Sequence, residues 1–78
     1  MTIRVELYGT LRRFSTAGSP GIWIGEAPES ASLANLVSII GAPPREIAVI
    51  SINGKTAPMD TVISPGDEII MVTHFGAG

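Results

Sequence analysis

The first residues of the chain alternate between apolar and polar side chains. Ile3, Val5 and Leu7 are each separated by a polar residue, so the apolar positions recur with a period of two. This period is typical of a β-strand with one buried face. Residues 15–21 are rich in glycine, proline and serine, which predicts a loop, and residues 22–24 then predict a second short strand. We expect the two strands to pair as a hairpin with a long connection.

Helical spacing follows in the middle of the chain. Four apolar residues lie at positions i, i+3, i+4 and i+7, which places them on one stripe of a helix. They are Leu33, Leu36, Val37 and Ile40. Ser30 and Ser32 are both candidates for the N-cap, because a serine side chain can accept a backbone N–H bond. Gly41 suits a left-handed C-terminal residue, and Pro43 and Pro44 prevent the helix from continuing.

The second half of the chain predicts further strands and tight turns. Residues 47–52 are apolar and rich in β-branched side chains, which indicates a central strand. The Asn-Gly pair at 53–54 is a strong hairpin-turn signal. Residues 56–63 predict either irregular structure or a short edge strand. The Pro-Gly-Asp turn at 65–67 leads into a last strand at 68–73, and Asp67 is expected to bond the backbone of that turn.

This order of elements predicts an α+β fold, in which one helix covers one face of a mixed sheet of four to five strands. The other face of the sheet is then uncovered. In the last strand Ile69 and Met71 point to one side, and Ile70 and Val72 point to the other. One pair belongs to the core, and the other is either covered by loops or exposed for docking. Trp23 is expected either beneath the loop that precedes its strand or on the uncovered face.

Composition excludes several classes of function. The chain has 78 residues, of which 45% are hydrophobic and 15% charged, so we expect one folded domain over residues 1–78. It has no cysteine, one histidine and a net charge of −2 without a basic run. A thiolate nucleophile, a zinc site and a nucleic-acid footprint are therefore not expected. The N-terminus does not resemble a signal peptide, and no apolar stretch approaches the roughly 20 residues of a membrane span. We expect a cytoplasmic protein that does not associate with membranes.

The charged residues and the histidine do not suggest an active site. Asp60, Asp67 and Glu68 are too scattered to indicate a metal site, so no bound metal or cofactor is expected. The charges of Arg12 and Arg13 either meet an acidic partner or are simply solvated, and solvation is the simpler interpretation. The lone histidine, His74, is interpreted as a surface residue at the end of a strand. A stand-alone enzyme is therefore disfavoured.

The last residues, Gly76, Ala77 and Gly78, suit a thin tail whose carboxylate enters a narrow site on another protein. The alternative is a frayed chain end, which is common at termini. We interpret residues 75–78 as a flexible tail. Phe75 either anchors this tail in an apolar groove of a partner or folds back on its own sheet.

Four segments, in this order, resemble the MoaD/ThiS family of sulfur-carrier proteins, which are small ubiquitin-like β-grasp domains. The segments are IRVELYGTLR at 3–12, SLANLV at 32–37, VISINGK at 49–55 and GDEI at 66–69. The resemblance covers nearly the whole chain. It implies a protein substrate of an adenylating enzyme and not an enzyme itself.

In such carriers the chain ends in Gly-Gly, and an E1-like enzyme uses ATP to adenylate the terminal carboxylate. Sulfur then displaces AMP to give a thiocarboxylate, which a partner consumes. The resemblance implies that Gly78 carries the sulfur and that Phe75, Gly76 and Ala77 enter the partner. The partner is the large subunit of molybdopterin synthase for a MoaD-like carrier, or thiazole synthase for a ThiS-like one.

Ala77 departs from the family pattern, because a glycine is expected at the penultimate position. Its methyl group disfavours a positive φ, although an extended tail tolerates it. A third interpretation therefore stays open, in which the chain is a β-grasp subunit that binds non-covalently and has lost transfer chemistry.

Overall fold

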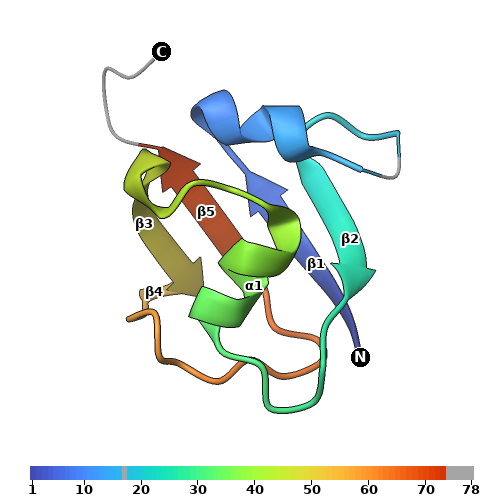
Figure 1. Ribbon diagram of the computed structural model, residues 1–78, viewed down its shortest axis with the longest axis vertical. Coiled ribbons are helices and arrows are strands. Elements are labelled where there is room, and N and C mark those ends of the chain that lie inside the picture. The colour runs from blue at the N-terminus through green and yellow to red at the C-terminus, as the bar shows by residue number, and fades with distance from the viewer. Residues whose placement is uncertain (17, 74–78) are drawn as a thin grey trace.

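A computed structural model describes residues 1–16 and 18–73 of the chain. Within these residues, five strands form one sheet, and a single α-helix packs on one of its faces (Figure 1). Two short 3-10 helices, η1 and η2, lie at one end of the sheet. In chain order the elements are β1 (Thr2–Leu7), η1 (Gly9–Phe14), β2 (Ile22–Glu26), α1 (Leu33–Ile40), η2 (Pro44–Glu46), β3 (Ile47–Ile52), β4 (Lys55–Thr56) and β5 (Ile69–Thr73).

The sheet is mixed, and its strands follow the order β2-β1-β5-β3-β4. Strands β1 and β5 run parallel, with Leu7 opposite Met71, whereas the other neighbours run antiparallel. The predicted hairpin between the first two strands is confirmed, since Val5 lies opposite Trp23. The α+β fold predicted from the order of elements is therefore confirmed, and its topology is that of a ubiquitin-like β-grasp.

The core lies between α1 and one face of the sheet. The apolar stripe of the helix and the inward positions of β1 and β5 are all buried. The most deeply buried large side chains are Val5, Leu7, Leu11, Leu33, Leu36, Val37, Ile63, Ile69 and Met71. In β5, the core pair is therefore Ile69 and Met71. Every buried residue among the described residues is of a hydrophobic type, so apolar burial is the main stabilising contribution.

The helix begins and ends at residues that satisfy its free backbone groups. The Ser32 hydroxyl accepts the N–H of Asn35 at 3.1 Å, and the Asn35 side chain accepts the N–H of Ser32 at 3.0 Å. This reciprocal capping box selects Ser32 as the N-cap. Ser30, the other candidate, lies in the preceding turn with a φ of 68°. Gly41 ends the helix with a φ of 88°, as its left-handed conformation requires.

The two predicted turns after α1 are confirmed and are bonded to each other. Asn53 and Gly54 have φ values of 53° and 85°, which the two central residues of this hairpin turn require. The Asp67 carboxylate accepts the N–H of Ser64 at 2.7 Å and the side-chain amide of Asn53 at 3.1 Å. These bonds fix the entry into β5. Of the open alternatives for residues 56–63, only Thr56 belongs to a strand, and the rest is irregular.

Trp23 belongs to the core on the helix-covered face of the sheet, with 7% of its surface exposed. The interpretation that placed it on the uncovered face is wrong. Period-two alternation puts Trp23 on the same side as Val5, its cross-strand partner, and that side faces α1. Its indole ring also covers Gly25, where an added Cβ would lie 2.6 Å from the ring.

Among the described residues, no helix is both long enough and apolar enough to cross a membrane.

Candidate docking site

The residues that the sequence nominates for chemistry and partner binding follow strand β5. Gly78, Phe75, Gly76 and Ala77, and also His74, lie outside the described residues. Strand β5 ends at Thr73, the last residue that the structure describes. The part of the candidate site that can be built from geometry is therefore the surface around the C-terminal end of β5.

The end of β5 is held between two other elements. Thr73 lies opposite Ile47 at the start of β3. On the other side it meets Gly9, at the start of η1, so closely that a Cβ on Gly9 would overlap the Thr73 hydroxyl. Gly9 also has a φ of 64°, a conformation that favours glycine. These contacts therefore fix the position of Thr73 at the end of the sheet.

An apolar row crosses the uncovered face of the sheet at this end. Val72 of β5 lies opposite Val49 of β3. On the other side of β5, the backbone N–H of Tyr8 donates to the carbonyl of Met71 at 3.0 Å, which continues the parallel register of β1. Tyr8, Val49 and Val72 have exposed fractions of 48%, 42% and 36%. We name these three residues the exit patch.

The surface beside the exit patch is less exposed. The next row across the same face consists of Glu6, Ile70 and Ser51, which are half-buried. The hydroxyl of Tyr8 donates to a carboxylate oxygen of Glu6 at 3.3 Å, which holds the phenol ring over this row. The exit patch is therefore a small apolar surface, and the row beside it carries the polar side chains of Glu6 and Ser51 on either side of Ile70.

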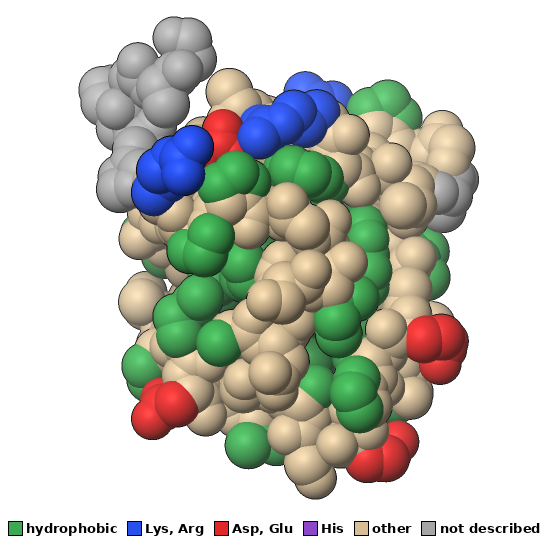
Figure 2. Space-filling model, viewed as in Figure 1, with side chains coloured by type: hydrophobic (Ala, Val, Ile, Leu, Met, Phe, Trp, Pro, Cys, Tyr) green, Lys and Arg blue, Asp and Glu red, His purple; other side chains and the backbone are tan. Residues whose placement is uncertain are grey.

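Basic side chains surround the same end of the molecule. Arg12 and Arg13 belong to η1, and Arg45 belongs to η2, which directly precedes the strand that pairs with Thr73. Figure 2 shows the helix side of the molecule, where Lys and Arg side chains gather at this end and most visible Asp and Glu side chains lie toward the other. Such an asymmetry favours an approach by an acidic surface.

One of these arginines is engaged within the chain. Two nitrogens of Arg13 donate to the Glu46 carboxylate at 2.6 and 3.1 Å, and its guanidinium lies 4.5 Å from the centre of the Phe14 ring. The hydrogen bonds from Arg13 hold the pKa of Glu46 below its ordinary value, and the same bonds raise the pKa of Arg13. The pair ties η1 to η2. Arg12 and Arg45 are exposed and form no salt bridge with another described residue.

A comparison with protein families assigns the chain. A family model described as Mut7-C ubiquitin matches residues 1–76. The chain belongs to the Mut7-C ubiquitin family. A search of curated proteins finds no significant match.

Two solved structures share the fold of this Mut7-C ubiquitin protein. A crystal structure of SAMP1 from Haloferax volcanii has a TM-score of 0.73 at 18% identity and covers 100% of both chains. A second crystal structure, of H. volcanii small archaeal modifier protein 1, has a TM-score of 0.71 at 16% identity and covers 92% of this chain and 95% of that one. These are ubiquitin-like β-grasp proteins related to MoaD and ThiS, so the resemblance predicted from the sequence is confirmed.

The described residues of this Mut7-C ubiquitin protein form no cluster suited to a metal ion. No group of three or more His, Cys, Asp or Glu residues among the described residues is placed to hold a metal ion. Every buried side-chain nitrogen and oxygen atom there has a hydrogen-bond partner. Among the described residues, the exposed apolar row at the end of β5 is the surface best suited to binding a protein.

Sequence reasoning found only part of the exit patch. The alternation in β5 predicted that Ile70 and Val72 share one face of the sheet, whereas Ile69 and Met71 share the other. Tyr8 and Val49 were missed, although Tyr8 follows Leu7 and so continues the period of two by one step. The missing information was the strand order, which places β1 and β3 on either side of β5.

Proposed function

We propose that this chain is a protein carrier that works through a free carboxylate on Gly78. An E1-like enzyme activates this carboxylate with ATP, and the product is a thiocarboxylate used for sulfur transfer. The observation that supports the proposal best is the position of the exit patch. It is centred on Val72 of β5, the strand that precedes residues 74–78, and lies on the face of the sheet that α1 leaves open.

The proposed chemistry needs little from the carrier itself. A carboxylate is a poor electrophile, and adenylation gives it a leaving group. A sulfide sulfur then attacks the carbonyl carbon, the bond from that carbon to the AMP oxygen breaks, and a thiocarboxylate remains. If the donor is a persulfide, the first product is an acyl disulfide, and a thiol cleaves its S–S bond to release the thiocarboxylate and a disulfide. The catalytic groups belong to the enzyme, and the carrier supplies binding and orientation. Proteins of this fold that serve as modifiers or carriers are typically not enzymes, and ubiquitin-like modifiers generally work with E1-like enzymes.

The described surface suits this task in two ways. The exit patch offers apolar side chains that gain stability when a partner covers them. The arginines of η1 and η2 attract an acidic partner and orient it toward the end of β5. Together they would align residues 74–78 with the adenylation site. Phe75, Gly76 and Ala77 would then pass through a channel of the enzyme, with the Ala77 methyl accommodated by an extended backbone.

The sulfur acceptor that we favour is the large subunit of molybdopterin synthase, because the opening segment at 3–12 resembles that of MoaD. Thiazole synthase is the acceptor if the carrier is ThiS-like. The neighbouring genes would separate the two pathways. No cofactor is expected on the carrier in either pathway, since ATP is consumed by the adenylating enzyme.

A second candidate function is protein modification. It is favoured by the fold likeness to a protein described as a small archaeal modifier. In this case the activated carboxylate of Gly78 would be attacked by an amine of a target protein. Both functions share the adenylation step, so the product separates them.

Intact-mass spectrometry tests the proposal. The full chain, with its terminal residue verified by mass, is incubated with ATP, a cognate E1-like enzyme and a sulfur donor. We expect a mass gain equal to the replacement of one oxygen by sulfur. The same chain lacking Gly78 is the control and should not react. Conjugates with other proteins would instead support modification.

The same reconstitution tests non-covalent binding. Residues 76–78 are deleted, and both the affinity for the sulfur-accepting enzyme and the activity of that enzyme are measured. If neither changes, the chain acts as a binding subunit and the carrier proposal is wrong.

A further inference from the structure

One edge of the sheet is left without a neighbouring strand. Strand β3 has six residues, but β4 has two, and they pair only with Ser51 and Ile52. One further bond continues the pairing, from the N–H of Ala57 to the carbonyl of Ile50 at 2.9 Å. Among the described residues, no strand lies beside the outer edge of residues 47–49.

The gap has a structural cause on each side. A β-bulge interrupts the pairing of β3 with β5 between Ile47 and Val49, and a bulge bends the strand that carries it. On the other side, the chain after Ala57 turns toward the helix, where the carbonyl of Met59 accepts the N–H of Ala34 at 2.9 Å. The two segments therefore diverge instead of pairing.

The opposite edge of the sheet is closed. The backbone N–H of Thr16 donates to the carbonyl of Ile22 at 2.7 Å, and the Thr16 hydroxyl accepts the N–H of Ile24 at 2.7 Å. A loop thus occupies the outer edge of β2, as natural proteins commonly arrange to prevent unwanted pairing. The contrast marks the β3 edge as the accessible one.

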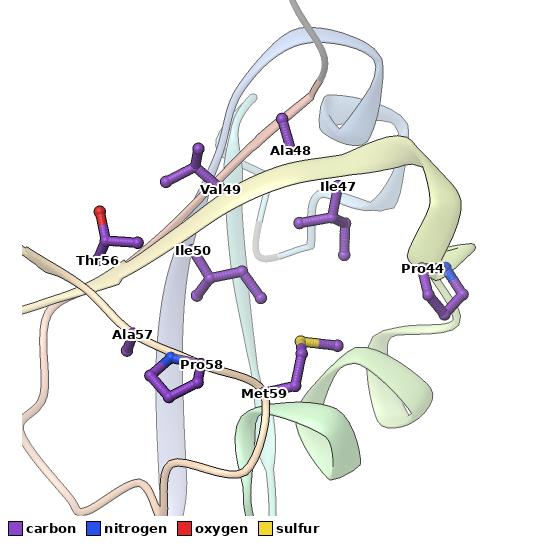
Figure 3. A pocket seen from close by; sticks show the side chains of 9 residues that line it. All are labelled: Pro44, Ile47, Ala48, Val49, Ile50, Thr56, Ala57, Pro58 and Met59. Carbon is purple, nitrogen blue, oxygen red and sulfur yellow. The ribbon is translucent and has the colours of Figure 1, made fainter.

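The gap beside β3 holds an apolar pocket with a cavity volume of about 290 Å³. In Figure 3 the side chains of Ile47, Ile50 and Met59 point into the space between β3 and the segment that follows β4. None of the lining residues carries a charge. They are Pro44, Ile47, Ala48, Val49, Ile50, Thr56, Ala57, Pro58 and Met59. The pocket therefore accepts an apolar side chain at the side of an open strand edge.

Positive charges flank the pocket at its two ends. Arg45 follows Pro44 at one end, and Lys55 precedes Thr56 at the other. Both side chains belong to exposed residues, and neither forms a salt bridge with another described residue. Glu46, the nearest acidic residue to Arg45 in the chain, is bonded to Arg13 instead. An occupant with acidic residues on either side of an apolar centre matches this arrangement.

We propose that the β3 edge binds an extended segment of a partner protein by strand addition. The segment has a short apolar, β-branched centre and acidic residues at both ends. Its backbone would pair with residues 47–49, a length of about 10 Å at the usual rise of a strand. One apolar side chain would enter the pocket against Met59, and the acidic residues would meet Arg45 and Lys55. Backbone pairing supplies affinity in such complexes, and the pocket supplies selectivity.

The probe that tests this inference is a synthetic peptide, acetylated and amidated, of sequence Glu-Glu-Val-Ile-Val-Ile-Glu-Glu. It is titrated into the ¹⁵N-labelled chain, and the amide shifts are followed by NMR. We expect the shifts to centre on residues 47–49 and on Ala57 and Met59. The Met59→Lys variant should bind about tenfold more weakly, since one buried apolar contact is lost. Val62→Lys, at an exposed valine outside the pocket, is the matched control and should bind normally.

Two modified peptides separate strand addition from other forms of binding. A peptide N-methylated at alternate residues cannot donate its edge hydrogen bonds and should not bind. A peptide with lysine in place of glutamate should bind roughly two- to tenfold more weakly, since two exposed ion pairs are reversed.

Several results would overturn the inference. Equal binding of the N-methylated peptide would show that the pocket takes a side chain or small apolar molecule without strand pairing. Shifts that appear with increasing protein concentration alone would show that a second copy of the chain occupies the edge. Shifts centred on Tyr8 and Val72 would place the peptide on the exit patch.

Discussion

The two faces of the sheet use the same strands for different purposes. Met71 and Val72 are neighbours in β5, yet the first is 0% exposed and the second is 36% exposed. Met71 packs in the core beneath α1, and Val72 belongs to the exit patch. A period of two thus separates the residues that hold the fold together from those available to a partner.

At the end of β5 both faces of the sheet carry apolar side chains, Met71 on the covered face and Val72 on the uncovered one. A strand with one face in water usually carries polar residues on that face. Here Val49 and Val72 face outward as a cross-strand pair and are 42% and 36% exposed. The proposed function assigns this apolar surface to contact with a partner.

The largest expected effect tests the division of roles directly. Met71→Ala removes a fully buried side chain and should lower the free energy of unfolding by about 2–5 kcal/mol. Val72→Ala should lower it by less than about 1 kcal/mol, because that side chain is partly in water. Urea unfolding followed by the fluorescence of the buried Trp23 measures both. Equal losses would show that the uncovered face also supports the fold.

The next effect concerns the contact between Gly9 and Thr73 at the end of β5. Gly9→Ala should destabilise the fold by about 1–3 kcal/mol, because it strains a positive φ and overlaps Thr73. Gly18→Ala is the matched control, since Gly18 also has a positive φ but nothing within 4 Å of an added Cβ. A larger loss at Gly9 than at Gly18 is expected, and Thr73→Ala should remove the difference. Equal losses at the two glycines would mean that the contact with Thr73 is unimportant.

The exit patch should matter for activation more than for stability. Val72→Asp places a charge in the proposed contact with the adenylating enzyme, and kcat/KM for adenylation should fall at least about tenfold, or about 1.4 kcal/mol. The same substitution at Val62, which is 59% exposed and lies outside the patch, should leave adenylation unchanged. If both variants are adenylated at the normal rate, the enzyme docks elsewhere.

The sequence was sufficient for the elements whose signals are local. The stripe of α1, the caps at Ser32 and Gly41, and the turn at Asn53 depend on residues within a few positions of one another. The stripe, the Gly41 cap and the turn therefore followed from spacing and residue type alone. For the N-cap, the sequence left Ser30 and Ser32 open, and the capping box of the structure selects Ser32. The end of the short edge strand β4 at Thr56 could not be predicted in this way. It depends on a contact with the distant helix, where the carbonyl of Met59 accepts the N–H of Ala34.

The candidate site depended on contacts between distant parts of the chain. The row formed by Tyr8, Val72 and Val49 exists only because β5 lies between β1 and β3. The position of Trp23 stayed open for the same reason, since its face is fixed by pairing with Val5 and not by its own neighbours in sequence. Alternation defines two faces of a strand, but only the assembled sheet decides which one the helix covers.

The smallest expected effect concerns a polar contact that belongs to neither face of the sheet. Hydrogen bonds from Arg13 lower the pKa of Glu46 in the folded chain below its ordinary value of 4.5. The folded state therefore binds fewer protons than the unfolded state in this range, so the pair stabilises the fold above pH 4.5. This contribution is lost as the pH falls through the lowered pKa.

Glu46→Gln should accordingly reduce the urea midpoint slightly at neutral pH and not at all in strong acid. Arg13→Gln breaks the same pair from the other side and should show the same loss of pH dependence. Both are measured by urea unfolding at neutral pH and in steps below pH 4.5. A difference from the natural sequence that stays constant into acid would assign the effect to packing against Phe14. A lower urea midpoint at neutral pH but not in acid would show that the exposed ion pair between Arg13 and Glu46 adds to stability, although it does not belong to the buried core.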